Sequence, residues 1–439
     1  MKNVLIIGSD FVPSSLPPAV RIRFFATHLR EFGWNPTILT TDPSYYESRN
    51  DPENEALIPS DLEVVRTAAI PAEKGRRFGI GCIGMRSMWQ HWRRAVALCR
   101  ERRFDVIFIP VPPYMPMALG RLLHMRFGIP YVIDYIDPWV TEHYWALPRS
   151  QRPPKHALAY YQARIVEPFA VRRASGITGV SQGTVDGVVE HYSWLKKACT
   201  AAIPYGGEPA DFEYLRHHPR PQRLFDPNDG MAHFVYVGAC IRPMFPTVRA
   251  LFAAIRKGLD TNPELFSRLR LHFVGTSYDP KNTDKVSAPL AKEAGISHLV
   301  DEHPPRLPFL EALQVLLDAH SILVLGSDAP HYTASKVFPG ILAKRPLLAI
   351  FHQASSVVDI LNRTRAGELV TYGADNPPET HVDEIVETVA RMLRLPRNYE
   401  PPTQWEEFER YTTRATTRDL AAVFDAAASP VAARVVQHA

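Results

Sequence analysis

The chain has 439 residues, which is enough for two domains of ordinary size, each with its own hydrophobic core. Charged residues make up 22% and hydrophobic residues 46%, as in globular proteins, and a formal charge of +4 is too small an excess to indicate nucleic-acid binding. The four cysteines have no metal-ligand spacing, and no apolar run approaches the length of about twenty residues that a membrane span needs. The sequence begins directly on a strand-like segment without a signal-peptide pattern, so we expect a cytoplasmic protein.

The first half of the chain alternates short apolar runs with apolar patterns of helical period, which is the order of a parallel α/β sheet. Strands are expected at 4–8, 36–41, 62–67, 105–109, 129–135 and 177–181. Helices are expected at 22–29, in the second half of 76–103, and at 115–127 and 155–173. The loop after the first strand lacks the Gly-x-Gly-x-x-Gly pattern of dinucleotide binders, so a dehydrogenase is disfavoured.

A second series of alternating units follows a polar, proline-rich stretch at 217–230 that has no periodicity and is predicted to be a linker. Strands are expected at 233–238, 269–275, 298–303, 322–326, 347–351 and 368–372. Helices are expected at 284–294, 307–319, 355–362, 382–393 and 405–427. The chain is therefore predicted to be an α/β protein with two Rossmann-like parallel-sheet domains.

The stretch 328–351 contains the strongest functional signal, because a strand ends there, a loop turns and a helix opens. Ser335 is predicted to be the N-cap of that helix, which places Lys336 among the free amides of the first turn. The positive end of a helix dipole together with a lysine favours a phosphate group. The predicted ligand is the pyrophosphate of a nucleotide.

This stretch resembles the donor-site segment of the nucleotide-sugar glycosyltransferases of the GT-B fold, in the retaining family four. The residues that fall in the register of the family pattern are Ser335, Lys336, Phe338, Leu342, Arg345 and Pro346. The family also carries two glutamates eight positions apart, the second of which contacts the ribose of the donor. Here those positions are His331 and Pro339, and proline cannot make that contact.

The resemblance implies two Rossmann-like domains that face a cleft, with a C-terminal helix that crosses back to the first domain. The expected divisions are a first, acceptor-side domain at 1–216, a linker at 217–230, a donor-binding domain at 231–400 and a returning helical segment at 401–439. The donor-binding residues that the resemblance implies are Arg21, Gly238, Arg242, Gly275, His303, Ser335 and Lys336. For Arg21 an alternative stays open, namely a solvated arginine on the face of a helix.

The acceptor side is expected after the strand at 129–135, since ligands of parallel sheets gather beyond the carboxyl ends of strands. The resemblance places Asp137, Trp139 and His143 there. Asp137 has a second interpretation, in which it caps the loop that follows it. His143 rests on its place in this loop alone.

The resemblance implies a retaining glycosyltransferase that moves a sugar from a nucleoside-diphosphate sugar to a glycan or lipid-linked acceptor, in cell-surface polysaccharide or glycoconjugate biosynthesis. The sequence has no Asp-x-Asp triplet, so we expect no metal and no cofactor, with Arg242 and Lys336 stabilising the departing diphosphate and Asp137 as a third catalytic residue. Two alternatives stay open: a relative that binds sugar nucleotides without catalysis, and a nucleotide-sugar epimerase on the same fold.

The stretch 76–103 combines arginines with tryptophans. Such a helix can lie on an anionic membrane and reach a lipid-linked acceptor, which indicates a peripheral contact at the inner face of a membrane. The alternative is an amphipathic helix that packs Met88, Trp92, Ala95 and Leu98 against the sheet and leaves its arginines in water.

Overall fold

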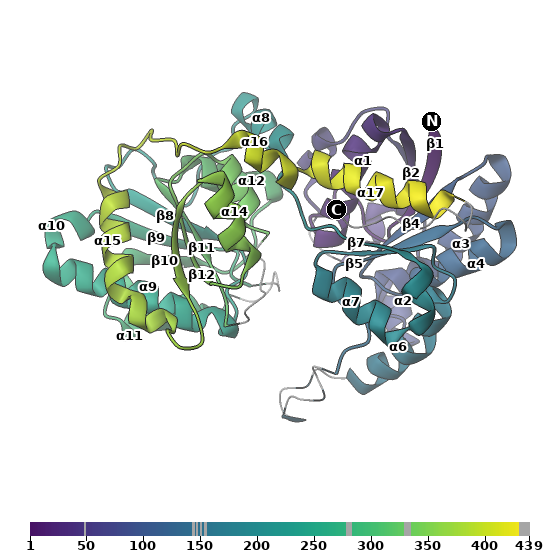
Figure 1. Ribbon diagram of the computed structural model, residues 1–439, viewed down its shortest axis with the longest axis horizontal. Coiled ribbons are helices and arrows are strands. Elements are labelled where there is room, and N and C mark those ends of the chain that lie inside the picture. The colour runs from purple at the N-terminus through teal and green to yellow at the C-terminus, as the bar shows by residue number, and fades with distance from the viewer. Residues whose placement is uncertain are drawn as a thin grey trace. The chain divides into compact units, whose positions relative to one another are not determined.

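The computed structural model describes residues 1–47, 50–142, 145, 148–149, 152, 156–277, 283–328 and 335–429. The chain forms two compact units (Figure 1). Residues 1–205 and the C-terminal segment from Thr413 form the first unit, and Gly206–Thr412 forms the second. The chain therefore passes between the units twice, after Tyr205 and after Thr412.

The described part of the first unit contains a seven-stranded parallel sheet in the order β3-β2-β1-β4-β5-β6-β7. Its strands are β1 (Lys2–Ile7), β2 (Trp34–Thr41), β3 (Glu63–Thr67), β4 (Val106–Val111), β5 (Tyr131–Tyr135), β6 (Gly176–Gly179) and β7 (Cys199–Ala202). The central strands are continuous apolar runs because both of their faces are covered, as is usual for parallel sheets.

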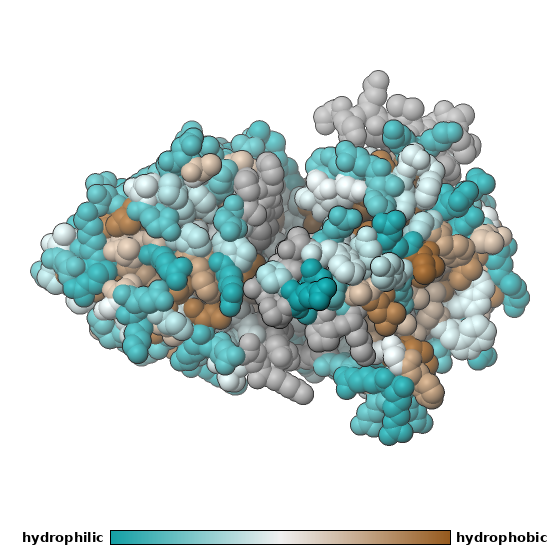
Figure 2. All heavy atoms as spheres, turned by 90° about the horizontal axis from the view of Figure 1, so that it is seen from below, coloured by the Kyte–Doolittle hydropathy of each residue, from teal (hydrophilic) through white to brown (hydrophobic). Residues whose placement is uncertain are grey.

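Helices cover both faces of this sheet (Figure 1). They are α1 (Pro17–His28), α2 (Ala72–Arg77), α3 (Ile83–Glu101), α4 (Met117–Phe127), α6 (His156–Val171), α7 (Gln182–His191) and α17 (Thr413–Ala428). Alternate residues of β1 serve the two faces: Val4 packs toward α1 and α17, and Leu5 toward α3 and α4. Figure 2, seen from below relative to Figure 1, looks onto the side where α6 lies and shows apolar residues at the surface there.

The second unit contains, in its described residues, a six-stranded parallel sheet in the order β10-β9-β8-β11-β12-β13. Its strands are β8 (Ala232–Val237), β9 (Leu269–Val274), β10 (Val300–His303), β11 (Ser321–Leu325), β12 (Leu347–His352) and β13 (Glu368–Tyr372). Its helices are α8 (Pro209–His217), α9 (Phe245–Thr261), α10 (Pro263–Phe266), α11 (Ser287–Glu293), α12 (Phe309–Asp318), α13 (Val337–Leu342), α14 (Ser356–Thr364), α15 (Val382–Leu393) and α16 (Trp405–Phe408).

Helix α9 is the one long element for which the sequence analysis gave no prediction. It packs Val248, Leu251, Phe252 and Ile255 on one face of the second sheet. That spacing is the helical period of an amphipathic helix, so the signal was present and was not used. Together with α15, α9 buries the face of β8 that carries Phe234.

The prediction of two parallel-sheet α/β domains with a C-terminal helix that returns to the first of them is confirmed. The segment predicted as one helix at 405–427 is in fact two, α16 in the second unit and α17 in the first. A 3₁₀ turn, Glu409–Tyr411, separates them, and the chain crosses between the units directly after it. In the first unit α17 packs on α1 and on the 3₁₀ turn Leu29–Phe32 that follows it, where Arg414 Nε donates to Glu31 Oε2 at 2.6 Å.

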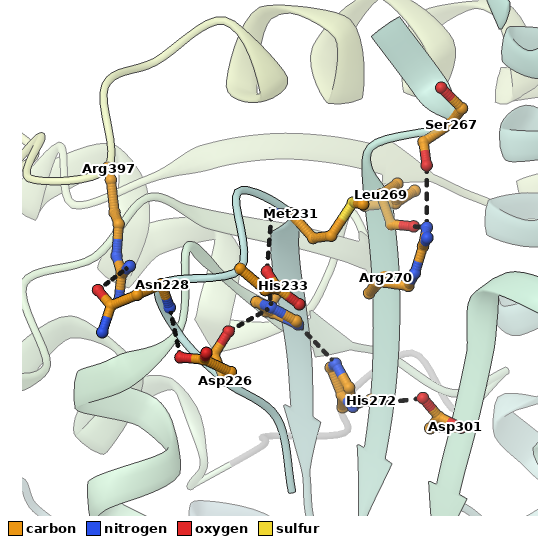
Figure 3. Close-up of polar contacts among 11 residues, drawn as sticks. Asp226, Asn228, Met231, His233, Ser267, Leu269, Arg270, His272, Asp301 and Arg397 are labelled. Carbon is orange, nitrogen blue, oxygen red and sulfur yellow. Dashed lines mark hydrogen bonds and ion pairs between the residues drawn. The ribbon is translucent and has the colours of Figure 1, made fainter. Parts of the chain in front are cut away.

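The stretch at 217–230 does not lie between the two units, as the sequence predicted, but inside the second one. Its start packs on α12, where Arg220 N donates to Gln314 Oε1 at 3.0 Å. Its end packs on β8, where the His233 ring lies 3.1 Å from the Asp226 carbonyl and 2.9 Å from His272 (Figure 3). The sequence analysis placed the division between the domains at 216, whereas the first unit ends at Tyr205 and α8 belongs to the second.

None of the helices in the described ranges has both the length and the apolar composition that a membrane crossing requires.

Candidate donor-binding site in the second unit

The backbone after β8 and β9 continues the pairing of the sheet and brings three predicted residues together. Gly238 N donates to the Val274 carbonyl at 2.7 Å, and Gly275 N donates to the His303 carbonyl at 2.8 Å. Gly238 and Gly275 have φ values of 134° and 71°, in the region that favours glycine. Gly238, Gly275 and His303 thus form one edge at the carboxyl ends of β8, β9 and β10, where parallel sheets bind ligands.

Lys336 lies across this edge, directly over Gly238. A Cβ atom added to Gly238 would lie 2.2 Å from Lys336 Cε. The lysine side chain therefore occupies space that is available only because residue 238 has no side chain. Lys336 Nζ donates to Tyr236 Oη at 2.5 Å and to the Ala239 carbonyl at 3.1 Å, and it lies 4.6 Å from the centre of the Tyr236 ring. Among the described residues, these two acceptors occupy two of the three protons of the ammonium group.

The charge of Lys336 makes this edge attractive to anions. Burial lowers the pKa of Lys336 to about 8, the Cys240 side chain opposes this change, and the positive charge of Arg306 adds to it. Burial also raises the pKa of Cys240 to about 12, so this side chain is a neutral thiol at pH 7. At pH 7 the ammonium is therefore mostly protonated, with a second cation as its neighbour.

Arg306 is a candidate ligand for an anion that sequence reasoning missed. It follows β10, and its Cα lies 3.5 Å from the place of a Cβ on Gly275. Arg306 lies three residues after His303 in the sequence. A charged residue just after a predicted parallel strand was therefore the signal that could have identified it. Within the described residues, Nε2 of His303 is buried without a hydrogen-bond partner, and burial lowers the pKa of His303.

Glu302 positions the loop after β9 without contributing to the open edge. Its buried carboxylate accepts hydrogen bonds from the backbone amides of Val286, Ser287 and Ala288, each at 2.9 Å, and from Thr276 Oγ1 at 2.7 Å. A carboxylate at the start of a helix satisfies free amides and complements the helix dipole. Glu302 therefore holds both the start of α11 and Thr276, which follows Gly275.

Ser335 is not the N-cap that the sequence predicted. Lys336 occupies the N-cap position of α13, without a side-chain capping bond, and the carbonyl of the exposed Ser335 accepts a hydrogen bond from Phe338 N at 3.3 Å. Pro339 lies in the first turn of α13, where an amide has no intrahelical partner, so the helix accepts the proline and Phe338 stays helical. His331 lies outside the described residues.

Arg242 begins a 3₁₀ turn, Arg242–Met244, directly before α9. The Pro243 carbonyl accepts a hydrogen bond from Asp328 N at 2.9 Å, which ties this turn to the loop after β11. The Arg242 side chain is exposed, and among the described residues its guanidinium has no hydrogen-bond or ion-pair partner. Its role at the donor phosphates stays a prediction.

Arg21 has a different role from either of the two predicted for it. Its side chain is 1% exposed, and it donates to Asp134 through Nε at 2.6 Å and through a terminal nitrogen at 2.8 Å. The same terminal nitrogen donates to the Ile203 carbonyl at 2.7 Å, and Thr178 Oγ1 donates to Asp134 Oδ1 at 2.7 Å. Arg21 is thus neither a solvated arginine nor a ligand for the donor, because a buried bidentate ion pair uses it inside the first unit.

The predicted acceptor residues lie after β5 in the first unit. Tyr114 Oη donates to the Asp137 carbonyl at 3.2 Å, and the Trp139 ring stacks on Tyr114 with 5.1 Å between the ring centres. Partial burial raises the pKa of the Asp137 carboxyl. The role of Asp137 and Trp139 at an acceptor stays a prediction, and His143 lies outside the described residues.

Asp10, at the carboxyl end of β1, is a further candidate that the sequence analysis did not name. It is 4% exposed, and burial raises its pKa to about 6 although the positive charge of Arg86 opposes this. Arg86 itself is buried and donates to the Ile70 carbonyl at 2.9 Å and to Glu47 Oε2 at 3.0 Å. A carboxyl with a raised pKa beyond a parallel strand is a group that proton transfer can use.

Replacing Asp10 by asparagine should stabilise the protein at neutral pH. The folded protein binds the Asp10 proton more tightly than the unfolded chain, so stability falls as pH rises from about 4 to about 6 and then stays constant. Because about two pKa units correspond to about 3 kcal/mol, Asp10→Asn should be more stable by up to that amount above pH 6 and no different below pH 4. Urea unfolding across this pH range measures the difference. Asp61→Asn, at an exposed carboxylate, is the control, and an unchanged or lower stability of Asp10→Asn at pH 7 would contradict the prediction.

The apolar packing that the alternative predicted for the stretch 76–103 is confirmed, but Arg86 of this stretch is buried and not in water. Ala95 and Leu98 of α3 are buried in the core, and Met88 and Trp92 pack against it. The membrane contact of this stretch stays a prediction.

In the described part of the chain, no group of three or more histidine, cysteine, aspartate or glutamate side chains is arranged to hold a metal ion.

Comparisons with known proteins agree with this architecture. Residues 18–206 match the family model of the glycosyl transferase 4-like domain. No curated protein matches the sequence. A UDP-forming α,α-trehalose-phosphate synthase from Burkholderia xenovorans is similar in structure, with 11% identity, coverage of 98% of this chain and 100% of that one, and a TM-score of 0.59.

Two further solved structures show the same fold. One is a trehalose-6-phosphate structure from E. coli bound with UDP-2-fluoro glucose, with 11% identity, coverage of 97% and 96% of the two chains and a TM-score of 0.52. The other is described as a candidate UDP-N-acetylglucosamine 2-epimerase from Listeria monocytogenes, with 10% identity, the same coverage and a TM-score of 0.51. The chain thus has the two-domain fold of these structures, and its residues 18–206 match the glycosyl transferase 4-like domain.

Proposed function

We propose that the protein transfers a sugar from a nucleoside-diphosphate sugar to a hydroxyl group of a glycan or of a lipid-linked acceptor. The observation that carries this proposal is Lys336, held over Gly238 by Tyr236 and Ala239 at the carboxyl end of β8, with Arg306 as a neighbouring cation. Cations at this edge of a parallel sheet suit a diphosphate. The glycosyl transferase 4-like match of residues 18–206 supports the same reaction.

In the proposed reaction the bond between the sugar carbon and the diphosphate oxygen breaks, and a bond from that carbon to the acceptor oxygen forms. Negative charge develops on the leaving diphosphate, and Lys336 stabilises it, with Arg242 and Arg306 as further cations. The acceptor proton passes to the leaving phosphate on the same face of the sugar, so the configuration of the sugar is retained. Asp137 is proposed to orient the acceptor, and no cofactor takes part.

Uridine diphosphate is the first donor nucleotide to test. The similar structure from Burkholderia xenovorans is that of a UDP-forming enzyme, and the one from E. coli is bound with UDP-2-fluoro glucose. In this chain the loop after β10, with His303 and Arg306, is the proposed contact for the nucleotide. The proposed setting is cell-surface polysaccharide or glycoconjugate synthesis in the cytoplasm.

A panel of radiolabelled nucleotide sugars, incubated with and without glycan and lipid-linked acceptors, tests this function. We expect nucleoside diphosphate to be released when the acceptor is present, and nuclear magnetic resonance of the product to show the anomeric configuration of the donor. Isomerised nucleotide sugar without any acceptor would point to the epimerase. Binding of a nucleotide sugar without either reaction would identify a non-catalytic relative. Isomerisation without acceptor and binding without reaction would each contradict the proposal.

The affinity for a nucleoside diphosphate should fall as pH rises through the pKa of Lys336. Below about pH 8 the side chain is positive and attracts the diphosphate, whereas above it the neutral amine does not. Each pH unit above that value should weaken this contribution about tenfold until other contacts dominate. Isothermal titration calorimetry from about pH 7 to about pH 9.5 measures the change, and Tyr236→Phe, which removes one acceptor of the ammonium, should shift the profile. An affinity that is constant over this range would contradict the role of Lys336.

A further inference from the structure

The outward face of α6 in the first unit carries a continuous row of apolar side chains. Leu158 is 67% exposed, Tyr161 59%, Ile165 73% and Phe169 42%. The spacing of three and four residues places these side chains on one face of the helix, one turn after another. Figure 2 views the first unit from this side and shows apolar residues gathered at its surface.

The opposite face of α6 is buried and is apolar apart from Glu167. Ala163, Ala170 and Val171 are 0% exposed, and the last two belong to the core beneath the sheet. A helix of a globular protein that lies on a sheet normally presents polar residues to water. Single exposed apolar residues need no explanation, but a contiguous row marks an interaction surface.

Cations border this row and no exposed carboxylate of α6 interrupts it. Arg164 is exposed on α6, and Arg172 and Arg173 are exposed in the turn directly after it. The one acidic residue of the helix, Glu167, is buried and accepts hydrogen bonds from Tyr135 and Tyr192 at 2.9 Å each. Glu142 is the acidic group outside the helix that acts on Arg164.

The surface continues from the end of α6 onto the 3₁₀ turn Ser193–Lys197. The guanidinium of Arg172 lies 5.7 Å from the centre of the Trp194 ring, and Trp194 is half-exposed. Lys196 and Lys197 follow it and are exposed. Aliphatic side chains, half-exposed aromatic rings and arginines or lysines in one surface are the composition of protein segments that lie in the headgroup region of a bilayer.

We propose that the outer face of α6, with Trp194, Lys196 and Lys197, docks the first unit on an anionic membrane surface. The apolar row enters the boundary between headgroups and acyl chains, and the cations remain at the phosphate level. A second copy of the chain is the less suitable occupant, because a twofold contact through this face would bring like-charged arginines together. The proposal does not depend on the donor site, which lies in the other unit.

Vesicle co-sedimentation of the full chain tests this proposal, with vesicles of phosphatidylcholine alone and with about 30% phosphatidylglycerol. We expect binding to the anionic vesicles, little binding to phosphatidylcholine alone, and a loss of about tenfold or more in both Ile165→Asp and Arg172→Glu/Arg173→Glu. The matched control is Trp89→Ser/Arg93→Glu, at exposed positions of α3, which should bind like the wild type. Circular dichroism and melting temperature verify that all variants fold, since every substituted side chain is exposed.

The proposal is overturned if the wild type does not bind anionic vesicles, or if the α6 variants bind them as well as the wild type does. It is also overturned if the α3 control loses as much binding as the α6 variants. Light scattering after gel filtration tests whether a second copy of the chain covers this face instead. A wild-type dimer that dissociates in Ile165→Asp, together with no vesicle binding, would show that the face binds a second copy. Sugar transfer to a water-soluble acceptor should be unchanged in the α6 variants, so failure here leaves the proposed reaction intact.

Discussion

Replacing Lys336 by alanine is expected to lower turnover by about 10²- to 10³-fold, the usual effect of removing one preorganised group that stabilises developing charge. The reason is local: the ammonium is fixed by Tyr236 and the Ala239 carbonyl at the place proposed for the departing diphosphate, and no rearrangement is needed to use it. Initial rates with the best donor of the panel measure the effect. Lys292→Ala, at an exposed lysine of α11, is the control and should keep the wild-type rate.

A variant that leaves Lys336 in place distinguishes its position from its mere presence. Gly238→Ala introduces a Cβ 2.2 Å from Lys336 Cε at a residue with a φ of 134°, so the lysine must leave its path. We expect most of the loss seen in Lys336→Ala, with a folded protein. Gly183→Ala, on α7 where an added Cβ meets open space, controls for the substitution itself. Near-normal rates in both site variants would refute the assignment of Lys336.

The largest effect on stability is expected from Asp134→Asn. This change leaves the guanidinium of Arg21 buried without its counter-charge, and breaking a buried pair in this way costs about 3–5 kcal/mol. It also weakens the hydrogen bond from Thr178 Oγ1. Urea unfolding followed by circular dichroism should show the transition of the first unit at a lower concentration.

An exposed ion pair of the same unit is the matched control for that experiment. Lys2 Nζ lies 2.7 Å from Asp425 Oδ1, with about half of each side chain exposed, and such pairs contribute about 0–1 kcal/mol. Lys2→Ala should therefore unfold almost like the wild type. Equal, small effects of Asp134→Asn and Lys2→Ala would contradict the account of Arg21 as a buried structural residue.

The architecture could be predicted from the sequence because parallel strands buried on both faces are continuous apolar runs. The runs that became β1 and β8 are examples, and each is followed by a loop and a helical pattern. The boundary between the units could not be predicted in the same way. The proline-rich composition at 217–230 indicated a linker, but hydrogen bonds such as Arg220 N to Gln314 Oε1 tie this stretch to the second unit.

Residues of the candidate site could be predicted where a local pattern determines their place, and not where a distant partner does. Lys336 was predicted from its motif and Gly238 from the family resemblance, and the structure brings the two together. Arg21 was misassigned because its partner Asp134 lies 113 residues away in the sequence, and burial of a charge leaves no local signal. Arg306 was missed because a resemblance guided the choice of residues and the family pattern used here does not include that position.

The central claim is that the cationic edge of the second unit, with Lys336 over Gly238, binds a nucleoside diphosphate. Calorimetric titration of UDP and GDP into the wild type and Lys336→Ala at pH 7 tests it most directly. We expect measurable affinity of the wild type for at least one of them and an affinity lower by about tenfold or more in the variant, because a charged hydrogen bond is lost. No affinity of the wild type for either nucleotide, or equal affinity in both proteins, would contradict it.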